Sequence, residues 1–144
     1  MSAVSQFLSP RVCCIDSSCA LGSRVYIPLV GPAPLICKAG GTAWIVSPAT
    51  AAVTRVWGCR DDASTYAQNV TGSSGWFVPT SGQLYNPGYV CRTYWDSYST
   101  SCYWSSSELN LTYASAVDFG NLGNLNTLLK GTALPVRALR AVTY

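Results

Sequence analysis

The sequence predicts an α+β domain in which two short helices pack on antiparallel strands. Short runs rich in apolar and β-branched residues recur along the chain between Gly, Pro and Ser, a pattern typical of strands joined by turns. Apolar residues that follow Asp62 repeat with helical spacing. Thr80 and Gln83 stand at the spacing of a capping box, the signature of a helix N-terminus.

The strand-like runs are expected to pair in antiparallel fashion. Runs 42–46 and 51–57 flank the turn-forming Ser47-Pro48, so these runs are predicted to form a hairpin. Further strands are predicted at residues 24–30, 89–94, 102–105, 114–119, 124–129 and 134–142.

Each predicted helix has a start signal and a stop signal. Asp61 or Asp62 can cap the first helix, and Gly72 follows its end. Its apolar residues have the spacing that places one helix face on the core: Ala63, Tyr66, Ala67 and Val70. The second helix is predicted over residues 80–86, where Pro87-Gly88 ends it.

The chain divides into an N-terminal arm, residues 1–39, and a domain, residues 40–144. The arm contains Cys and Pro, and its prolines restrict the backbone to extended or turn conformations. Two interpretations stay open. The arm is either a docking element for neighbouring subunits or a segment that wraps the core of its own domain.

The composition favours a folded chain that works within an assembly. Hydrophobic residues make up 49% and charged residues 10% of the sequence, so the surface carries few charges. The nine Lys and Arg are scattered and give a net charge of +3, without the basic stripe that nucleic acid binding needs. No run approaches the roughly 20 apolar residues of a membrane span. We therefore expect no nucleic acid partner and no membrane insertion.

Seven cysteines are many for an ordinary cytosolic domain, and the odd number leaves at least one outside an intramolecular disulfide. Disulfides and buried free thiols both remain open. A metal site is not predicted, because the paired cysteine spacing of zinc ribbons is missing and the sequence has no His. The disulfide candidates are Cys13, Cys14, Cys19, Cys37, Cys59, Cys91 and Cys102.

The residue types also disfavour catalysis. Without His, a Ser-His-Asp or Cys-His site is absent and the commonest general base is missing. A glycosidase needs two carboxylates that face each other across a cleft, for which Glu108 with Asp118 or Asp96 is the candidate pair. Structural roles are the favoured interpretation of these carboxylates. The sequence thus predicts a non-enzymatic chain without a cofactor.

Five motifs, in this order, carry a resemblance to a known family: GGTAWIV at 40–46, GWFVPTSGQL at 75–84, YWSSSE at 103–108, AVDFG at 116–120 and PVRALR at 135–140. Residues 40–144 resemble the C-terminal domain of bacterial collagen-like adhesins, which is related to the sulfatase-modifying enzymes. The resemblance implies a C-type-lectin-like fold. Phe77-Val78 and Gln83 depart from the family, which usually has Arg-Leu and Glu there. Cys91 and Cys102 do not match the copper-binding cysteine pair of the enzymes, so that activity is not implied.

The family also occurs as short free-standing chains in bacteriophages, and the resemblance implies a function of that kind. The expected protein is a virion structural protein of the tail, baseplate or fibre, assembled with other virion subunits and with its own copies. It would attach to a glycan or protein of the host surface. The alternatives are a capsid or tail cement protein that acts through its arm, and a secreted bacterial adhesin module.

Several residues are predicted to hold the fold. Glu108 is expected to pair with Arg137 or Arg140, and only one of these should reach it, because they point to opposite faces of a regular strand. Trp104 is expected to fill the core, since a Trp among strand signals usually buries most of its area. The full set is Trp76, Pro79, Thr80, Gln83, Trp104, Glu108, Arg137 and Arg140.

The candidate binding residues lie in a polar and aromatic stretch at 92–100. Tyr, Trp, Ser and Asn supply rigid contact area and adaptable hydrogen bonds, as in paratopes and sugar-binding surfaces. The alternative is an ordinary solvent loop with one buried aromatic ring. The candidates are Arg92, Tyr94, Trp95, Asp96, Tyr98, Asn110 and Tyr113.

Overall fold

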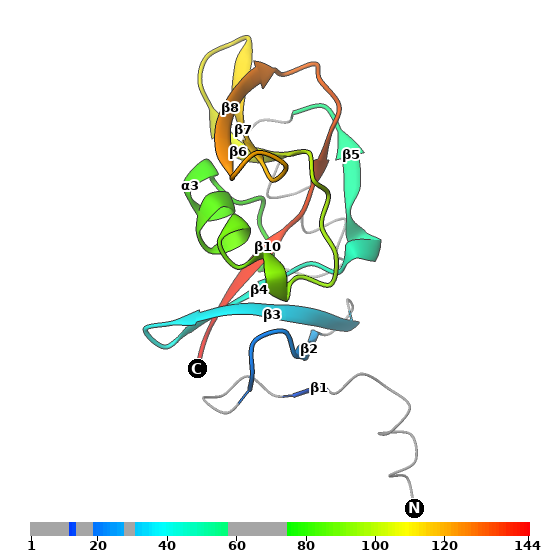
Figure 1. The fold of residues 1–144 in the computed structure, drawn as a ribbon, viewed down its shortest axis with the longest axis vertical. Helices are drawn as coiled ribbons and strands as arrows, with labels where there is room; N and C mark the ends of the chain where they lie inside the picture. Colours follow the sequence, from blue (N-terminus) through cyan, green and yellow to red (C-terminus); the bar gives the residue numbers. More distant parts are fainter. Residues whose placement is uncertain (1–11, 14–18, 28–30, 58–74) are drawn as a thin grey trace, which may run out of the picture.

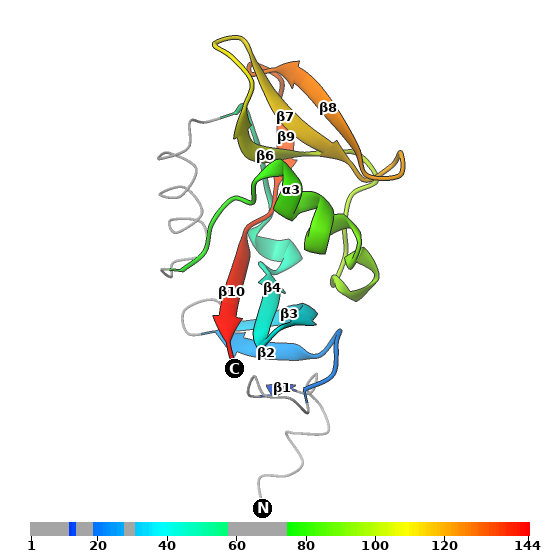
Figure 2. The ribbon, with the colours of Figure 1, turned by 90° about the vertical axis from the view of Figure 1, so that its left-hand side faces the viewer.

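The computed structural model describes residues 12–13, 19–27, 31–57 and 75–144. In this part of the chain the fold is mixed α+β and mainly β, as the sequence predicts. A sheet built around β3 and β4 lies at one end, the sheet of β6, β7 and β8 lies at the other, and the helical segment that starts with α3 lies between them (Figures 1 and 2). No helix in the described ranges is long and apolar enough to cross a membrane.

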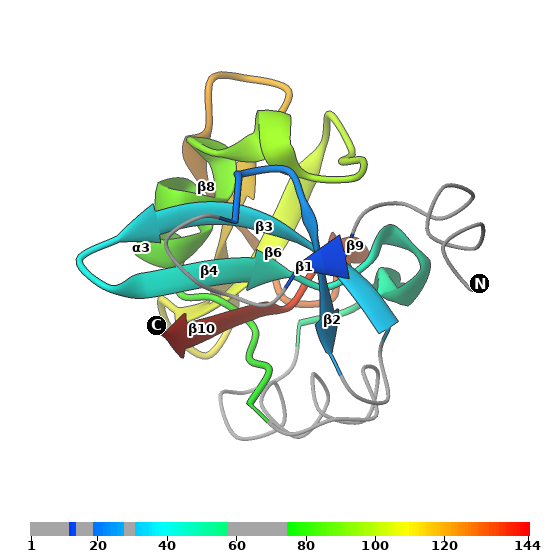
Figure 3. The same cartoon turned by 90° about the horizontal axis from the view of Figure 1, so that it is seen from below.

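The first sheet has the strand order β1-β2-β3-β4-β10. β1 (Val12–Cys13) is parallel to β2 (Arg24–Ile27), and the other pairs, with β3 (Gly31–Ala39), β4 (Thr42–Val46) and β10 (Leu139–Thr143), are antiparallel. Gly40 and Gly41, at φ 58° and 82°, form the turn between β3 and β4, because a two-residue hairpin turn of this type needs positive φ. Figure 3 shows β3, β4 and β10 side by side.

The predicted hairpin of residues 42–46 and 51–57 is wrong. Both edges of β4 are already paired, with β3 and with β10. After Pro48, the 3-10 turn η1 (Ala49–Ala51) leads the chain to β5 (Val53–Arg55), which pairs with β9 (Leu134–Val136). The chain therefore does turn at Ser47-Pro48, but the turn leads from one sheet to another and does not join two strands of a hairpin.

The third sheet consists of β6 (Cys102–Glu108), β7 (Tyr113–Asp118) and β8 (Asn124–Leu129) in an antiparallel order of β6-β7-β8. The prediction for β8 is confirmed at both ends, and β6 is longer than predicted. The predicted strand 134–142 is interrupted at Arg137-Ala138, which separates β9 from β10.

The capping box is confirmed. Thr80 Oγ1 accepts from the Gln83 N–H at 3.2 Å, and Gln83 Oε1 accepts from the Thr80 N–H at 3.0 Å. Helix α3 (Ser81–Gln83) starts there and runs into the distorted turn η2 (Leu84–Tyr89), which contains Pro87. The predicted helix at 61–70 lies outside the described residues.

The strand predicted at 89–94 is wrong, because this segment forms the end of η2 and the 3-10 turn η3 (Arg92–Tyr94). The Tyr94 N–H donates to Cys91 O at 3.0 Å and the Trp95 N–H donates to Arg92 O at 3.1 Å. These local bonds bring Tyr89 and Trp95 into the same buried cluster. The aromatic residues of this segment predicted a strand, but their rings are carried by the consecutive turns η2 and η3.

The β3–β4 part of the first sheet is buried on both faces. Leu35 and Ile45 belong to one core cluster, while the next residues, Ile36 and Val46, belong to a second. All four are fully buried. Residues 31–39 of the predicted arm thus form a central strand, and the predicted boundary at 39 and 40 falls in the β3–β4 turn.

Leu35→Ala is expected to lower the free energy of unfolding by about 2–5 kcal/mol, because it removes a fully buried side chain and leaves a cavity. Chemical denaturation of both proteins measures the change. Leu111→Ala is the control, since Leu111 is 95% exposed and its loss should change stability by less than about 0.5 kcal/mol. Equal stability of the two variants would show that β3 is not part of the core.

Candidate binding surface

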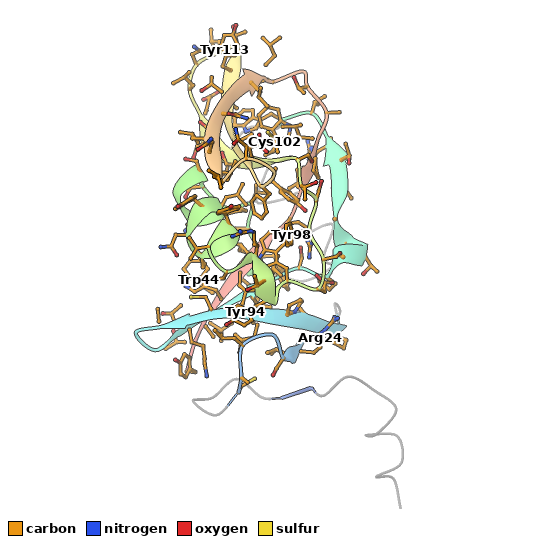
Figure 4. The ribbon with its side chains drawn as sticks, in the orientation of Figure 1. Arg24, Trp44, Tyr94, Tyr98, Cys102 and Tyr113 are labelled. Carbon is orange, nitrogen blue, oxygen red and sulfur yellow. The ribbon has the colours of Figure 1, made fainter. Side chains whose placement is uncertain are left out.

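The structure brings five of the predicted binding residues together and leaves two apart. Arg92 and Tyr94 lie in η3, and Trp95, Asp96 and Tyr98 follow in the loop that leads to β6. Asn110 lies in the β6–β7 loop, and Tyr113 is the first residue of β7. Figure 4 shows Tyr113 at the far end of the molecule, well away from Tyr94 and Tyr98.

A cluster of aromatic rings fixes the 84–101 segment to the third sheet. Phe119, just after β7, is its centre. Its ring centroid lies 4.8 Å from that of Tyr103, 5.2 Å from Trp95, 5.3 Å from Tyr89 and 5.9 Å from Tyr98. Tilted and edge-to-face contacts of this kind add to the burial of the rings. The cluster makes the segment rigid although it has little regular secondary structure.

The backbone of the same loop also touches the end of β7. The Phe119 N–H donates to Ser101 O at 3.1 Å. At Gly120 the approach is closer still, because a Cβ there would lie only 2.0 Å from Thr100 O. A residue with a side chain cannot occupy that position without moving the loop.

Trp95 and Asp96 are placed where they support the surface instead of forming it. Trp95 is 7% exposed and belongs to the second core cluster. Asp96 forms an ion pair with Arg137 at 2.8 Å, and its other carboxylate oxygen accepts from the Ala49 N–H at 2.8 Å. The guanidinium of Arg137 lies over the Trp95 ring at 4.9 Å. All three residues are parts of one buried network.

Hydrogen bonds to Asp96 lower the pKa of its carboxyl group. Burial alone raises this pKa, but the hydrogen bond from Ala49 N–H, the hydrogen bond and charge of Arg137, and the Ser97 N–H together outweigh burial. Asp96 is therefore ionised in the folded protein at neutral pH.

Exposed aromatic and apolar side chains lie around this rigid segment. Tyr85, Val90, Tyr94 and Tyr98 are all exposed. The Arg92 guanidinium lies 3.9 Å from the centre of the Tyr89 ring, and the Tyr85 ring stacks on Tyr89 at 5.9 Å. We call Tyr85, Val90, Arg92, Tyr94 and Tyr98 the tyrosine surface. It offers flat apolar faces, phenol hydroxyls and guanidinium donors.

Tyr85 and Val90 were not among the predicted binding residues. Tyr85 lies in the predicted second helix, but Tyr89, on which its ring stacks, lies beyond the predicted end of that helix. The sequence therefore offered no signal for Tyr85, and none for Val90.

Asn110 and Tyr113 serve a separate part of the fold. Asn110 Oδ1 accepts from the N–H groups of Thr112 and Tyr113 at 2.8 and 2.9 Å, which closes the β6–β7 turn. Tyr113 stands opposite Leu129 on β8. Neither residue contributes to the tyrosine surface.

The predicted pairing of Glu108 with Arg137 or Arg140 is wrong. Glu108, at the end of β6, forms an ion pair with Lys130, which directly follows β8. Arg137 binds Asp96, and Arg140 lies over the Trp76 ring at 6.0 Å. The prediction assumed that side chains alternate along one regular strand, but Arg137 lies in the link between β9 and β10.

The carboxylate pairs considered for glycosidase chemistry are also separated. Glu108 and Asp118 lie at opposite ends of the β6–β7 pair, since Glu108 is opposite Ala114 and Asp118 is opposite Cys102. Asp96 is engaged by Arg137. Neither arrangement places two carboxylates across a cleft from each other.

The remaining structural candidates have the contacts of a core. Trp76, Pro79 and Trp104 are buried, and the Trp104 Nε1–H donates to Arg55 O and Thr132 O at 3.1 Å. These bonds connect β6 to the end of β5 and to the segment just before β9. Thr80 and Gln83 form the capping box described above.

The cysteines differ in their state. Cys19 is disulfide-bonded, whereas Cys37, Cys91 and Cys102 carry free, half-buried thiols. Cys14, Cys59 and the side chain of Cys13 lie outside the described residues. Within the described ranges, no group of three or more Cys, Asp or Glu side chains could hold a metal ion.

A comparison with models of protein families found no match to this chain. A search of curated proteins likewise found no match.

Asp96→Ala is expected to lower the free energy of unfolding by about 3–5 kcal/mol at pH 7, because it leaves the buried Arg137 without its charged partner. The difference between wild type and Asp96→Asn should shrink as the pH falls below about 4. A carboxyl group whose pKa is lowered by folding stabilises the protein above its unfolded pKa of about 3.9, and this stabilisation is lost as pH falls through the folded pKa. Urea denaturation between pH 7 and pH 3 measures both effects.

Glu108→Ala is the matched control. Its ion pair with Lys130 is exposed, so its loss should cost less than about 1 kcal/mol. If Asp96→Ala and Glu108→Ala were equally stable, the Asp96–Arg137 pair would not hold the fold.

Proposed function

We propose that this chain is a non-enzymatic structural protein of a bacteriophage virion, in the tail, baseplate or a fibre, and that it binds a host-surface glycan through the tyrosine surface. The observation that carries the proposal is the exposure of Tyr85, Tyr94 and Tyr98 around a ring cluster that is itself buried. Rings held rigidly before binding lose little entropy when a ligand packs on them.

This segment carries little charge. Between residues 84 and 101 the charged residues are Arg92 and Asp96, and Asp96 is neutralised by Arg137. Arg92 keeps its positive charge, and its Nη1 donates to Tyr89 O at 3.0 Å. A sugar matches such a surface, because its apolar ring faces pack on tyrosines and its hydroxyls accept from the remaining guanidinium N–H groups.

The fold is consistent with the C-type-lectin-like architecture that the sequence resemblance implies. Two sheets with mainly antiparallel pairing are separated by a short helical segment, and the β4 and β10 strands, from the start and end of the resembling region, are paired. The Trp76 and Trp104 side chains of the resembling motifs are both buried in one cluster. These features support the assignment of a C-type-lectin-like fold, which is made by analogy. The proposed glycan binding rests on the tyrosine surface itself.

Tyr94→Ala is expected to weaken binding by about tenfold or more, which corresponds to about 1.4 kcal/mol, because it removes the exposed ring of η3 from the surface. An array of bacterial surface glycans, probed with the full chain, identifies the ligand, and titration of that glycan gives Kd for wild type and variant.

Tyr113→Ala provides the control. Tyr113 is 38% exposed and Tyr94 is 39% exposed, but Tyr113 lies at the far end of the molecule (Figure 4). Its substitution should leave Kd unchanged. Equal losses in both variants, or undiminished binding by Tyr94→Ala, would contradict the assignment of the surface.

A second candidate role, assembly with other copies of the chain, is favoured by exposed leucines on and around β8. β8 is an outer strand of its sheet. Antiparallel pairing of two β8 strands about Thr127 would place Leu125 of each copy opposite Leu129 of the other. Asp118 is the only charged residue between 109 and 129, so two such surfaces meet without strong repulsion. The exposed leucines are Leu109, Leu111, Leu122, Leu125 and Leu129.

The wild-type chain is therefore expected to self-associate, and the double variant Leu125→Lys, Leu129→Lys is expected to be monomeric. Like charges would face each other across the paired edges, a device by which natural sheets prevent edge pairing. Sedimentation velocity at several concentrations measures the change. Val56→Lys, at a similarly exposed position outside β8, should associate like the wild type. A monomeric wild type would rule out this role for β8.

A further inference from the structure

Two free thiols, those of Cys37 and Cys91, come together from distant parts of the sequence. Cys37 lies on β3, and Cys91 lies between η2 and η3, the helical turns that pack against β3. Both side chains are half-buried and pack against the same cluster, which contains Ile36, Leu84 and Tyr89.

A β-bulge places Cys37 on the side of the sheet where Cys91 lies. The register between β3 and β4 shifts between Leu35 and Cys37, and Ile36 is the residue between them. Leu35 belongs to the first core cluster, whereas both Ile36 and Cys37 pack in the second. In a regular strand Cys37 would share the face of Leu35, so the bulge redirects the thiol.

The Cys91 thiol interacts with the Cys37 side chain. Burial, the hydrogen bond with Cys37 and the nearby Cys37 charge raise the pKa of Cys91 to about 11. The Cys91 thiol is therefore protonated at neutral pH, and its thiolate becomes abundant only in alkaline solution.

We propose that Cys37 and Cys91 are a dithiol site, which closes to an intramolecular disulfide when it meets a small-molecule disulfide such as oxidised glutathione. One cysteine thiolate attacks the small disulfide, forms a mixed disulfide and releases one small thiol. The second cysteine loses its proton to solvent and attacks the protein sulfur, which releases the other small thiol. In total, two protein thiols are oxidised to one disulfide and one small disulfide is reduced to two thiols.

The bond would join η3 to the central strand of the first sheet. η3 carries Arg92 and Tyr94, so oxidation would tie this part of the tyrosine surface to β3 covalently. The chain between Cys37 and Cys91 also contains β4, β5, α3 and η2, and closing so long a loop restricts the unfolded chain strongly. The site itself does not depend on the proposed glycan binding.

The test starts from the full chain with Cys37 and Cys91 in the reduced state, equilibrated with oxidised glutathione at pH 7 and pH 9. Peptide mapping by mass spectrometry should find a Cys37–Cys91 cross-link in most molecules, and it should form faster at pH 9. The oxidised chain should melt at least about 5 °C higher than the reduced chain. Glutathione bound separately to both cysteines, without the cross-link, would overturn the proposal.

A second probe reports on the thiol pair without oxidation. A trivalent arsenical such as phenylarsine oxide bridges two neighbouring thiols, so the reduced chain should bind it at Cys37 and Cys91. The variants Cys37→Ala and Cys91→Ala should each lose this binding. Cys102→Ala, which removes another half-buried free thiol, should retain it. Loss of arsenical binding in Cys102→Ala, or its retention in Cys91→Ala, would place the site elsewhere.

Discussion

The guanidinium group of Arg137 is the point at which the separate parts of the fold are joined. It is 2% exposed, and it donates to Ser47 O from two nitrogens, at 2.6 and 3.1 Å, and to Ser97 O at 2.8 Å. Together with its ion pair to Asp96, these bonds connect the end of β4, the loop before β6 and the link between β9 and β10. A buried cation needs all of its donors satisfied, so the three segments cannot separate without a large cost in free energy.

The tyrosine surface depends on this junction. Arg137 lies over Trp95, and Trp95 contacts Phe119, Tyr98 and Tyr103. The network thus reaches the exposed Tyr98 through direct ring contacts. Short helical turns and loops form most of this region, and their position comes from buried side chains more than from backbone ladders. A preorganised binding site requires a rigid surface, and here buried side chains hold the surface in place without long helices or strands.

Sequence patterns predicted the features that depend on neighbours along the chain. The β8 boundaries and the capping box at Thr80 follow from local spacing. The partners of β5, Glu108 and Arg137 depend on segments far away, and each was predicted wrongly. Likewise, the polar and aromatic stretch at 92–100 was recognisable, but which of its rings face solvent was decided by Phe119 and Arg137, which lie 19 and 37 residues beyond its end.

The pairing of β4 with β10 also determines how the molecule can be attached to something else. Tyr144 is held at the β3–β4 turn, where its N–H donates to Gly41 O at 2.9 Å. The C-terminus therefore emerges at the opposite end from the β6–β7–β8 sheet (Figure 1). A dye, a surface tether or a second domain joined after Tyr144 would leave the leucine-bearing edge of β8 pointing outwards, which gives the chain a defined orientation on any support.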